Sequence, residues 1–235
     1  MLQFSTGKDN AKLKKLEKKT GKVVYSLDLS AGKSCPHAKI CKSMVIKTDD
    51  GLRIKDGKDC QFRCFAASQE VLFTHVYNRR YNNFIQLKQA KTIQGMKALI
   101  LKSLPKDAEI IRLHVSGDFF NVKYFEAAIA VAKETPHIRW YGYTKAIHSL
   151  HAHTLPDNLR LVASFGGKYD DKIANHTVSC QVVYSRKEAR DLGLPIDNND
   201  YHAYNCKKSF AVLIHGTQPK GSDAGKALVK LRKNK

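Results

Sequence analysis

The fold of this chain is decided by the segment Ile110-Ile111-Arg112-Leu113-His114-Val115-Ser116-Gly117-Asp118, in which an apolar stretch runs into a glycine turn. An apolar stretch of this length, bounded by a turn, is typical of a buried strand. Apolar residues then recur at helical spacing over 122–134, and another apolar stretch follows over 138–143. A strand, a helix and a second strand in this order predict a right-handed βαβ unit with parallel strands.

Further apolar stretches of strand length extend this pattern along the chain. They lie at 23–29, 159–165, 177–183 and 209–216. A closed barrel of eight βα units usually needs about 250 residues, whereas this chain has 235 residues and about six predicted strands. We therefore predict a single α/β domain over 1–235, built either as an incomplete (β/α)6-type barrel or as an open parallel sheet.

Three smaller elements complete the predicted domain. A basic N-terminal helix is expected within 7–22, because Asn10 can cap its start and Gly21 can end it. A polar hairpin with glycine turns is expected at 47–59, where it is inserted between the two cysteine pairs of the N-terminal third. A second basic helix, over 222–233, closes the chain.

Turns that carry polar or glycine residues follow several of the predicted strands. Ligands of parallel α/β proteins bind at the carboxyl ends of the strands, so the loops that start there are expected to converge on one face. We predict a cofactor-binding site at this face. Its predicted residues are Ser116, Gly117, Asp118, Gly166, Gly167 and His215.

The chain is strongly basic, with 41 Lys and Arg against 21 Asp and Glu and a formal net charge of +20. Such an excess attracts polyanions, and nucleic acid is the commonest polyanion in a cytoplasm. A merely solvated basic surface is the alternative interpretation. Arg79-Arg80, beside aromatic residues, is typical of a nucleic-acid groove and equally of a helix end over packed tyrosines. Lys220-Gly221-Ser222 is either a phosphate or carboxylate site or a capped helix N-terminus.

The sequence also bears on the compartment. No apolar run approaches the roughly 20 residues that span a bilayer, and the first residues lack the pattern of a secretory signal. We therefore expect a cytoplasmic protein without membrane contact. Thiols stay reduced there, so the 6 cysteines are better interpreted as ligands than as disulfides. Nothing in the sequence indicates an oligomeric state.

Two cysteine pairs lie in polar loops of the N-terminal third. Cys35 and Cys41 are separated by five residues, and Cys60 and Cys64 by three. Thiolates suit zinc or an iron–sulfur cluster, and zinc pairs usually have two to four intervening residues. The irregular spacing favours the larger core of a [4Fe–4S] cluster. Zinc is the alternative, and buried or incidental cysteines are the third interpretation.

The cysteines are not equal candidates for metal binding. Cys35, Cys41 and Cys64 rank first as ligands. Cys60 competes for the fourth position with Cys180, which lies in a predicted strand. The remaining cysteine, Cys206, is expected to be exposed and incidental.

The order of these elements resembles that of radical S-adenosylmethionine enzymes, which carry a three-cysteine loop after the first strand of a partial barrel and a Gly-Gly-Glu-like turn after the second. Here the Cys35 loop follows the first predicted strand and Ser116-Gly117-Asp118 follows the second. The resemblance implies that Asp118 binds the methionine amino group of S-adenosylmethionine and that Gly166-Gly167 helps to hold this cofactor. The cysteines of that family have the compact spacing Cys-x3-Cys-x2-Cys. Here the intervals are longer, with five residues between Cys35 and Cys41 and twenty-two between Cys41 and Cys64.

A second resemblance covers nearly the whole chain. The matching segments are Ser34-Cys35-Pro36 with Cys41, Phe62-Arg63-Cys64-Phe65-Ala66-Ala67-Ser68, His114-Val115-Ser116-Gly117-Asp118-Phe119 and Ile214-His215-Gly216-Thr217-Gln218-Pro219-Lys220-Gly221-Ser222. They resemble the phage gene product 88 family. This resemblance implies a viral or prophage setting, and hence the cytoplasm of the host cell, but no reaction. The thiols that it favours are Cys35, Cys41, Cys64 and Cys180.

Two functions follow as alternative hypotheses. The first is an iron–sulfur protein with its cluster at the carboxyl ends of the strands, performing radical S-adenosylmethionine-type chemistry with S-adenosylmethionine as small-molecule cofactor. The second is a non-enzymatic cluster or zinc protein that binds nucleic acid through its basic surface.

Overall fold

The computed structural model describes residues 1–174, 177–205 and 208–233. Within these residues, a seven-stranded sheet has the order β1-β2-β5-β6-β7-β8-β9. The strands are β1 (Phe4–Thr6), β2 (Val24–Leu27), β5 (Ile110–Leu113), β6 (Arg139–Thr144), β7 (Leu159–Ser164), β8 (Ser179–Val183) and β9 (Phe210–Leu213). Neighbours from β2 to β9 pair in parallel, whereas the edge strand β1 runs antiparallel to β2.

The edge strands of this sheet are β1 and β9. A mostly parallel sheet in a mixed α/β domain is therefore present as predicted, and the incomplete barrel is not confirmed. The predicted α/β class and the six parallel strands are correct. Strand β1 was not predicted, because its three residues are too few to carry a periodic signal.

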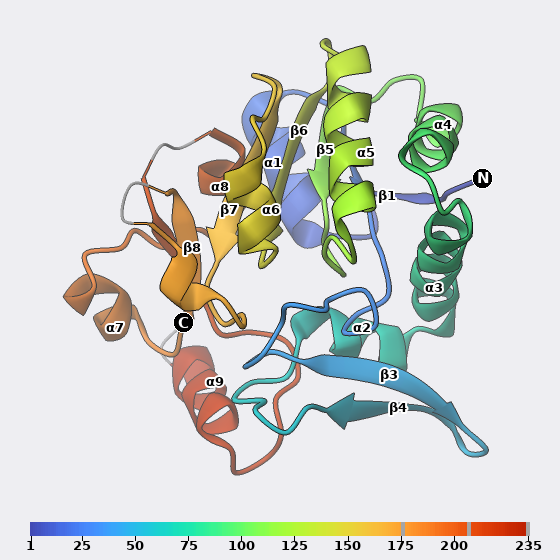
Figure 1. Cartoon of the computed structure of the whole chain (residues 1–235). Helices are drawn as coiled ribbons and strands as arrows, with labels where there is room; N and C mark the ends of the chain where they lie inside the picture. The colour runs from blue at the N-terminus through green and yellow to red at the C-terminus, as the bar shows by residue number, and fades with distance from the viewer. Residues whose placement is uncertain (175–176, 206–207, 234–235) are drawn as a thin grey trace.

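Helices cover both faces of the sheet. On one face, α3 (Thr74–Gln89), α4 (Ile93–Ser103) and α5 (Val122–Glu134) pack against an apolar core that includes Trp140 and Ile111. The opposite face packs against α1 (Ala11–Thr20) and the short helix α8 (Tyr201–Asn205). Figure 1 shows the sheet between α5 and α1.

The predicted caps of the first helix are confirmed. The Asn10 side chain accepts a hydrogen bond from the Lys12 backbone N–H at 2.8 Å, and Gly21 ends α1 at a φ of 68°. Apolar residues at helical spacing over 83–102 predict one continuous helix, and this prediction was wrong. A left-handed Lys91 (φ 58°) breaks the chain there, so that α3 and α4 are separate helices.

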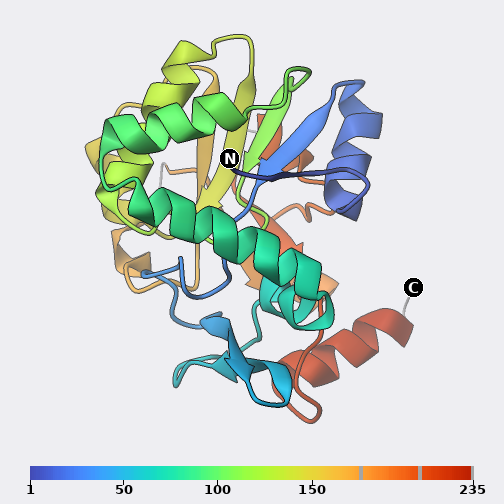
Figure 2. The same cartoon turned by 90° about the vertical axis from the view of Figure 1, so that its right-hand side faces the viewer.

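A two-stranded hairpin, an α-helix and the last helix gather at one end of the molecule. The hairpin consists of β3 (Ser43–Thr48) and β4 (Gly51–Asp56), and it begins four residues earlier than the predicted 47. Helix α2 (Phe65–Leu72) follows it. Both views place this hairpin, α2 and the C-terminal helix α9 (Asp223–Lys233) at the same end (Figures 1 and 2).

The remaining described helices are short, namely α6 (Ile147–Ala152), α7 (Arg186–Asp191) and the 3-10 turn η1 (Asp170–Lys172). Among the described residues, no helix has both the length and the apolar character needed to span a membrane.

Candidate functional site

A cavity of about 510 Å³ lies where the parallel strands end, between those ends, α2 and the loop that follows β2. We call it the thiol cavity. The residues from the sequence analysis that line it are Cys35, Cys41, Cys64, Ser116, Gly117, Asp118, Cys180 and His215. Ligands of parallel α/β proteins bind at this edge of the sheet. The predicted convergence of loops at one face is therefore correct for these residues.

Three of the predicted site residues do not line the thiol cavity: Cys60, Gly166 and Gly167. The Cys60 thiol instead lies 3.1 Å from the Phe62 carbonyl oxygen and 3.6 Å from the Ser43 hydroxyl. Cys206 lies outside the described residues. Among the described cysteines, those at 35, 41, 60, 64 and 180 form no disulfide.

A tight turn positions Cys35. The Ser34 hydroxyl donates to the Ser30 carbonyl oxygen at 2.7 Å, which folds the chain back on itself. Gly32 has a φ of 68°, and a Cβ atom there would lie 2.4 Å from the Ser43 carbonyl oxygen. Glycine is therefore required at this position, both for its backbone angle and for the close approach of the β3 strand.

A buried carboxylate ties the Cys35 loop to the rest of the site. The Glu70 side chain, from α2, accepts from the Ala31 backbone N–H and from the Ser116 hydroxyl, both at 2.9 Å. The Arg80 guanidinium lies 3.5 Å from the same carboxylate. Glu70 thus joins α2, the loop after β2 and the loop after β5, which brings Cys35 and Ser116 to one cavity.

This pairing also decides between the two interpretations of Arg79-Arg80. Arg80 is 3% exposed and bound to Glu70, and Arg79 pairs with Asp9 at 3.6 Å. These two arginines therefore serve packing within the protein, and they do not form a free basic groove.

The glycine pair Gly166-Gly167 holds the Cys41 loop. The Gly166 carbonyl oxygen accepts from the backbone N–H groups of Lys39 at 3.0 Å and Ile40 at 3.1 Å. The two glycine N–H groups donate in turn to the Asp170 carboxylate at 2.8 and 2.9 Å. The structure therefore places this pair behind the cysteine loop as its support and away from the cavity surface.

Cys64 occupies the N-cap position of α2, and its backbone N–H donates to the Ser43 hydroxyl at 3.1 Å. Burial, followed by the neighbouring Cys41 thiol, raises the pKa of the Cys64 thiol to about 11. Burial also raises the pKa of Cys35, and Asp118, Cys64 and Cys41 add to this rise. The Cys41 thiol thus contributes to the raised pKa of both other thiols, and all three line the same cavity. At neutral pH, Cys35 and Cys64 are protonated.

No three His, Cys, Asp or Glu side chains of the described chain are arranged as a ready-made metal site. The thiols share a cavity, but their present side-chain positions do not amount to a coordination sphere. Metal binding would require them to release their protons.

Asp118 is enclosed at the floor of the cavity, where the loops after β5 and β6 meet. Its carboxylate accepts from its neighbour Phe119 N–H at 2.7 Å, from the Thr144 hydroxyl at 2.8 Å and from the Lys145 N–H at 2.8 Å. Burial raises the pKa of Asp118, and these hydrogen bonds oppose the rise. The carboxylate therefore already fastens two strand ends together with protein donors.

Two histidines in the cavity are neutral. Burial lowers the pKa of both His114 and His215 to about 4. The His114 Nε2 atom lies 2.8 Å from the Tyr124 hydroxyl, and the His215 ring stacks on Phe65 with ring centroids 3.4 Å apart. Neither ring adds positive charge to the site near neutral pH.

A lysine supplies positive charge at the cavity wall. The Lys145 Nζ atom donates to the Ser164 hydroxyl at 2.6 Å. Burial alone would lower the pKa of Lys145, but Cys41, Cys180, Asp118 and Cys35 together outweigh it and raise the pKa. Lys145 is therefore charged. Burial raises the pKa of the Cys180 thiol to about 11, and Lys145 opposes this rise.

Beside the cavity, one buried carboxylate collects two cations. Asp200 is fully buried and pairs with Arg112 from β5 and with Lys12 from α1, the latter at 3.3 Å. The hydroxyls of Tyr141 and Tyr143 each lie 3.3 Å from the same carboxylate. This cluster joins α8 and α1 to the sheet next to the cavity wall.

The sequence model of one protein family, gene product 88, matches residues 2–232 of the chain. The chain belongs to the gene product 88 family. The predicted membership is therefore confirmed. No curated protein and no solved structure gives a match, so the resemblance to radical S-adenosylmethionine enzymes gains no support from the comparisons.

Sequence reasoning about this gene product 88 protein missed Lys145 and Arg112 as site residues. Arg112 carried a usable signal, since a charged residue inside the apolar strand Ile110–Leu113 needs a buried partner. The only sequence signal for Lys145 as a site residue was its position directly after a predicted strand. Asp200 lies in a polar stretch with no periodic pattern, and nothing in its local sequence indicates a buried position.

Proposed function

We propose that this gene product 88 protein binds a [4Fe–4S] cluster in the thiol cavity, with Cys35, Cys41 and Cys64 as ligands and Cys180 as the fourth. The observation that carries the proposal is the shared cavity: thiols from three separate segments line it together. Soft thiolates of this number are the usual ligands of such a cluster. The host-cell cytoplasm, a reducing compartment, would keep these thiols available.

Cys180 is preferred to Cys60 as the fourth ligand on the ground of placement. Cys180 lies on β8 and lines the thiol cavity. Cys60 is turned away from the cavity, toward the carbonyl oxygen of Phe62. Of the two candidates for the fourth ligand, we therefore prefer Cys180 to Cys60.

The other cavity residues suit a negatively charged group enclosed by protein. Lys145 places a positive charge on the same wall, while His114 and His215 stay neutral. Phe65 and Phe62 supply apolar surface. When bound, a cluster of this kind would supply one-electron transfer.

Metal analysis of anaerobically purified and reconstituted protein tests the proposal. We expect a brown protein with the broad visible absorption of an iron–sulfur cluster and about four irons per chain. A colourless protein that binds one zinc ion after the same treatment would contradict it. The same sample tests the predicted small-molecule cofactor, because S-adenosylmethionine bound at the cluster would change its electron paramagnetic resonance spectrum after reduction.

Replacing Lys145 with methionine is expected to lower the reduction potential of the bound cluster by roughly 50 to 100 mV. Reduction adds negative charge to the cavity, and Lys145 stabilises that charge. A unit charge several ångströms away, at an effective dielectric constant of about 20, contributes about 2 kcal/mol. A redox titration followed by electron paramagnetic resonance measures the shift.

Two further variants separate the charge of Lys145 from its contacts. Lys145→Arg keeps the charge and is expected to keep the potential near that of the unmodified protein. Ser164→Ala removes the hydroxyl that accepts from the Lys145 Nζ atom but leaves the charge in place. If Lys145→Arg lowered the potential as much as Lys145→Met, the electrostatic role assigned to this lysine would be wrong.

A further inference from the structure

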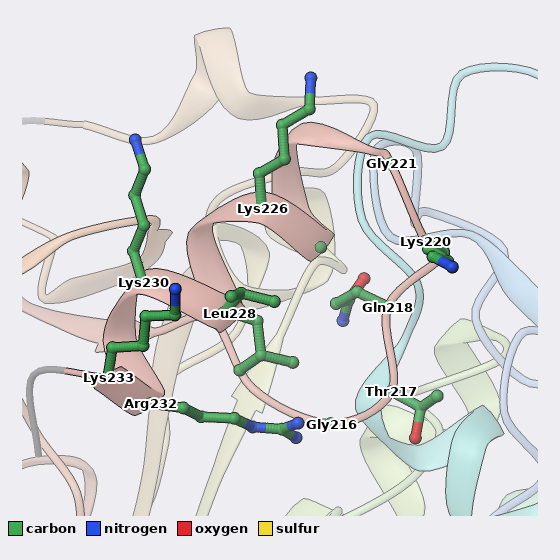
Figure 3. A pocket seen from close by; sticks show the side chains of 12 residues that line it. Gly216, Thr217, Gln218, Lys220, Gly221, Lys226, Leu228, Lys230, Arg232 and Lys233 are labelled. Atoms are coloured by element: carbon green, nitrogen blue, oxygen red, sulfur yellow. The ribbon is translucent and has the colours of Figure 1, made fainter.

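A second depression, with a volume of about 590 Å³, lies between α9 and the segment that links β9 to it. We call it the α9 groove. Its lining comes from 216–221 on one side and from α9 on the other. Figure 3 shows the Arg232 side chain extending from the helix toward Gly216, with Leu228 between the helix and the linking segment. Leu228 thus supplies apolar surface in the groove, and Arg232 brings a positive charge across it.

Five cationic residues contribute to the lining of the groove, although Figure 3 shows the Lys226 and Lys230 side chains extending from α9 away from the linking segment. The cationic side chains are Lys220, Lys226, Lys230, Arg232 and Lys233. Lys226 lies 3.7 Å from the Asp223 carboxylate. In the described part of the chain, no acidic side chain forms an ion pair with the other four cations. Their charge is therefore available to a ligand.

The α9 groove opens next to the thiol cavity. Gly216 and Thr217 line both. The inner face of α9 packs through Ala224 and Leu231 into the apolar cluster that also contains Cys41. The groove and the thiol cavity are therefore neighbours, with Gly216 and Thr217 between them.

We propose that the α9 groove binds the phosphodiester backbone of a nucleic-acid strand. The cations from Lys226 to Lys233 extend over about 10 Å of helix, because an α-helix rises about 1.5 Å per residue. Successive phosphates of one strand advance about 3.4 Å along the axis of a duplex, so cations spread over this length can face more than one phosphate. A single free phosphate would leave most of these cations unused.

The packing of α9 argues against a membrane as the partner. A helix that lies on a bilayer turns its apolar face to the lipid, whereas Ala224 is fully buried against the protein and Leu231 is packed beside it. Among the large apolar residues of α9, Val229 is the one that is strongly exposed, at 53%. The buried apolar face of α9 therefore leaves its cations to a nucleic-acid strand better than to a lipid surface.

This site also revises the role of Lys220-Gly221-Ser222. The Ser222 hydroxyl accepts from the Gly225 backbone N–H at 3.0 Å and caps the start of α9. The predicted cap is therefore present. The anion site that we propose does not rest on this helix end, because its cations lie along the groove.

Binding of fluorescently labelled single-stranded DNA, and of RNA with the same sequence, tests the proposal. The variant Lys230→Glu/Arg232→Glu reverses two of the groove charges. The control, Lys14→Glu/Lys18→Glu, makes the same change of charge on exposed positions of α1. Helix α1 lies at the other end of the molecule (Figures 1 and 2). Fluorescence anisotropy over a series of salt concentrations gives the affinity and its salt dependence.

We expect the α9 variant to bind at least about tenfold more weakly and with a shallower salt dependence, since fewer counterions are released. The α1 variant should lose less than about threefold. Equal losses in both variants, absent binding by the unmodified protein, or binding of anionic lipid vesicles with the same dependence on Lys230 and Arg232 would overturn the proposal. Thermal unfolding of both variants confirms that they are folded.

This proposal is independent of the metal content of the thiol cavity. The variant Cys35→Ala/Cys64→Ala is expected to retain nucleic-acid binding, since neither residue lines the α9 groove. Conversely, the α9 variant is expected to take up iron as the unmodified protein does. Failure of one proposal therefore leaves the other standing.

Discussion

Alanine at Cys35, Cys41 or Cys64 is expected to bring the iron content of reconstituted protein from about four irons per chain to nearly none. These thiols line one cavity, and the Cys41 thiol contributes to the raised pKa of both Cys35 and Cys64. Without one of them, the cluster would lose a ligand that no other described cysteine of the cavity replaces, because Cys180 is already the proposed fourth ligand. Iron and sulfide analysis, together with visible absorption, measures the loss.

Cys60→Ala is the matched control for these variants. Cys60 is a half-buried thiol four residues before Cys64, but it lies outside the thiol cavity. We expect this variant to retain about four irons per chain. If Cys60→Ala lost its iron as completely as Cys64→Ala, the ligand set would have to include Cys60. If Cys35→Ala kept its full iron content, the proposed site would be wrong.

Asp200→Asn is expected to lower the free energy of unfolding by about 3–5 kcal/mol, the usual cost of removing one partner of a buried ion pair. The change removes the negative charge opposite Arg112, whose side chain is 10% exposed. Asparagine is chosen because Asp200 has a φ of 62°, a backbone region that asparagine tolerates. Equilibrium unfolding in urea measures the difference.

The stabilisation by Asp200 depends on pH in a defined direction. Burial alone would raise the pKa of this carboxyl, but Arg112 and Lys12 outweigh it and hold the pKa below its ordinary value of 3.8. A lowered carboxyl pKa in the folded state stabilises the protein above the unfolded-state pKa, and this stabilisation is lost as the pH falls through the folded-state pKa. The difference in the free energy of unfolding between the unmodified protein and Asp200→Asn should therefore be largest near neutral pH. It should shrink in acid, below about pH 4.

A surface ion pair provides the control. Asp191 lies 2.6 Å from Lys187, and both side chains are more than half exposed. Asp191→Asn is expected to change the free energy of unfolding by less than about 0.5 kcal/mol, because solvent screens such pairs. Equal effects of Asp200→Asn and Asp191→Asn, or a loss at Asp200 that grows in acid, would contradict the role assigned to the buried carboxylate.

Much of the fold could be predicted because its signals are local. The spacing of apolar residues identifies the strand Ile110–Leu113 and the helix after it within a few residues. Asn10 and Gly21 mark the ends of α1, because the Asn10 side chain caps the first turn and Gly21 adopts a left-handed backbone conformation. The break near Lys91 was missed, since the apolar spacing continues across it. The choice between an incomplete barrel and an open sheet was not decided by local signals, because closure depends on how distant strands pair.

The candidate site was predicted in part. Cys35, Ser116, Asp118 and His215 were expected at the carboxyl ends of strands, and the structure places them around the thiol cavity. Gly166-Gly167 follows a strand in the same way, yet it supports the Cys41 loop from behind. Position along the chain indicates the end of the sheet on which a residue lies, but not whether it faces the cavity or the loop beneath it.

What the sequence determined by itself is therefore the order of strands and helices, the positive charge and the presence of thiols in polar loops. All three depend on composition or on a repeat of a few residues. The tertiary structure alone decided which thiols share a cavity, that Glu70 joins the loops around it, and that Arg112 meets Asp200 across 88 residues of chain. Such contacts form only when distant segments pack together. The free energy that stabilises them comes from the whole packed core, so no single stretch of sequence can reveal them.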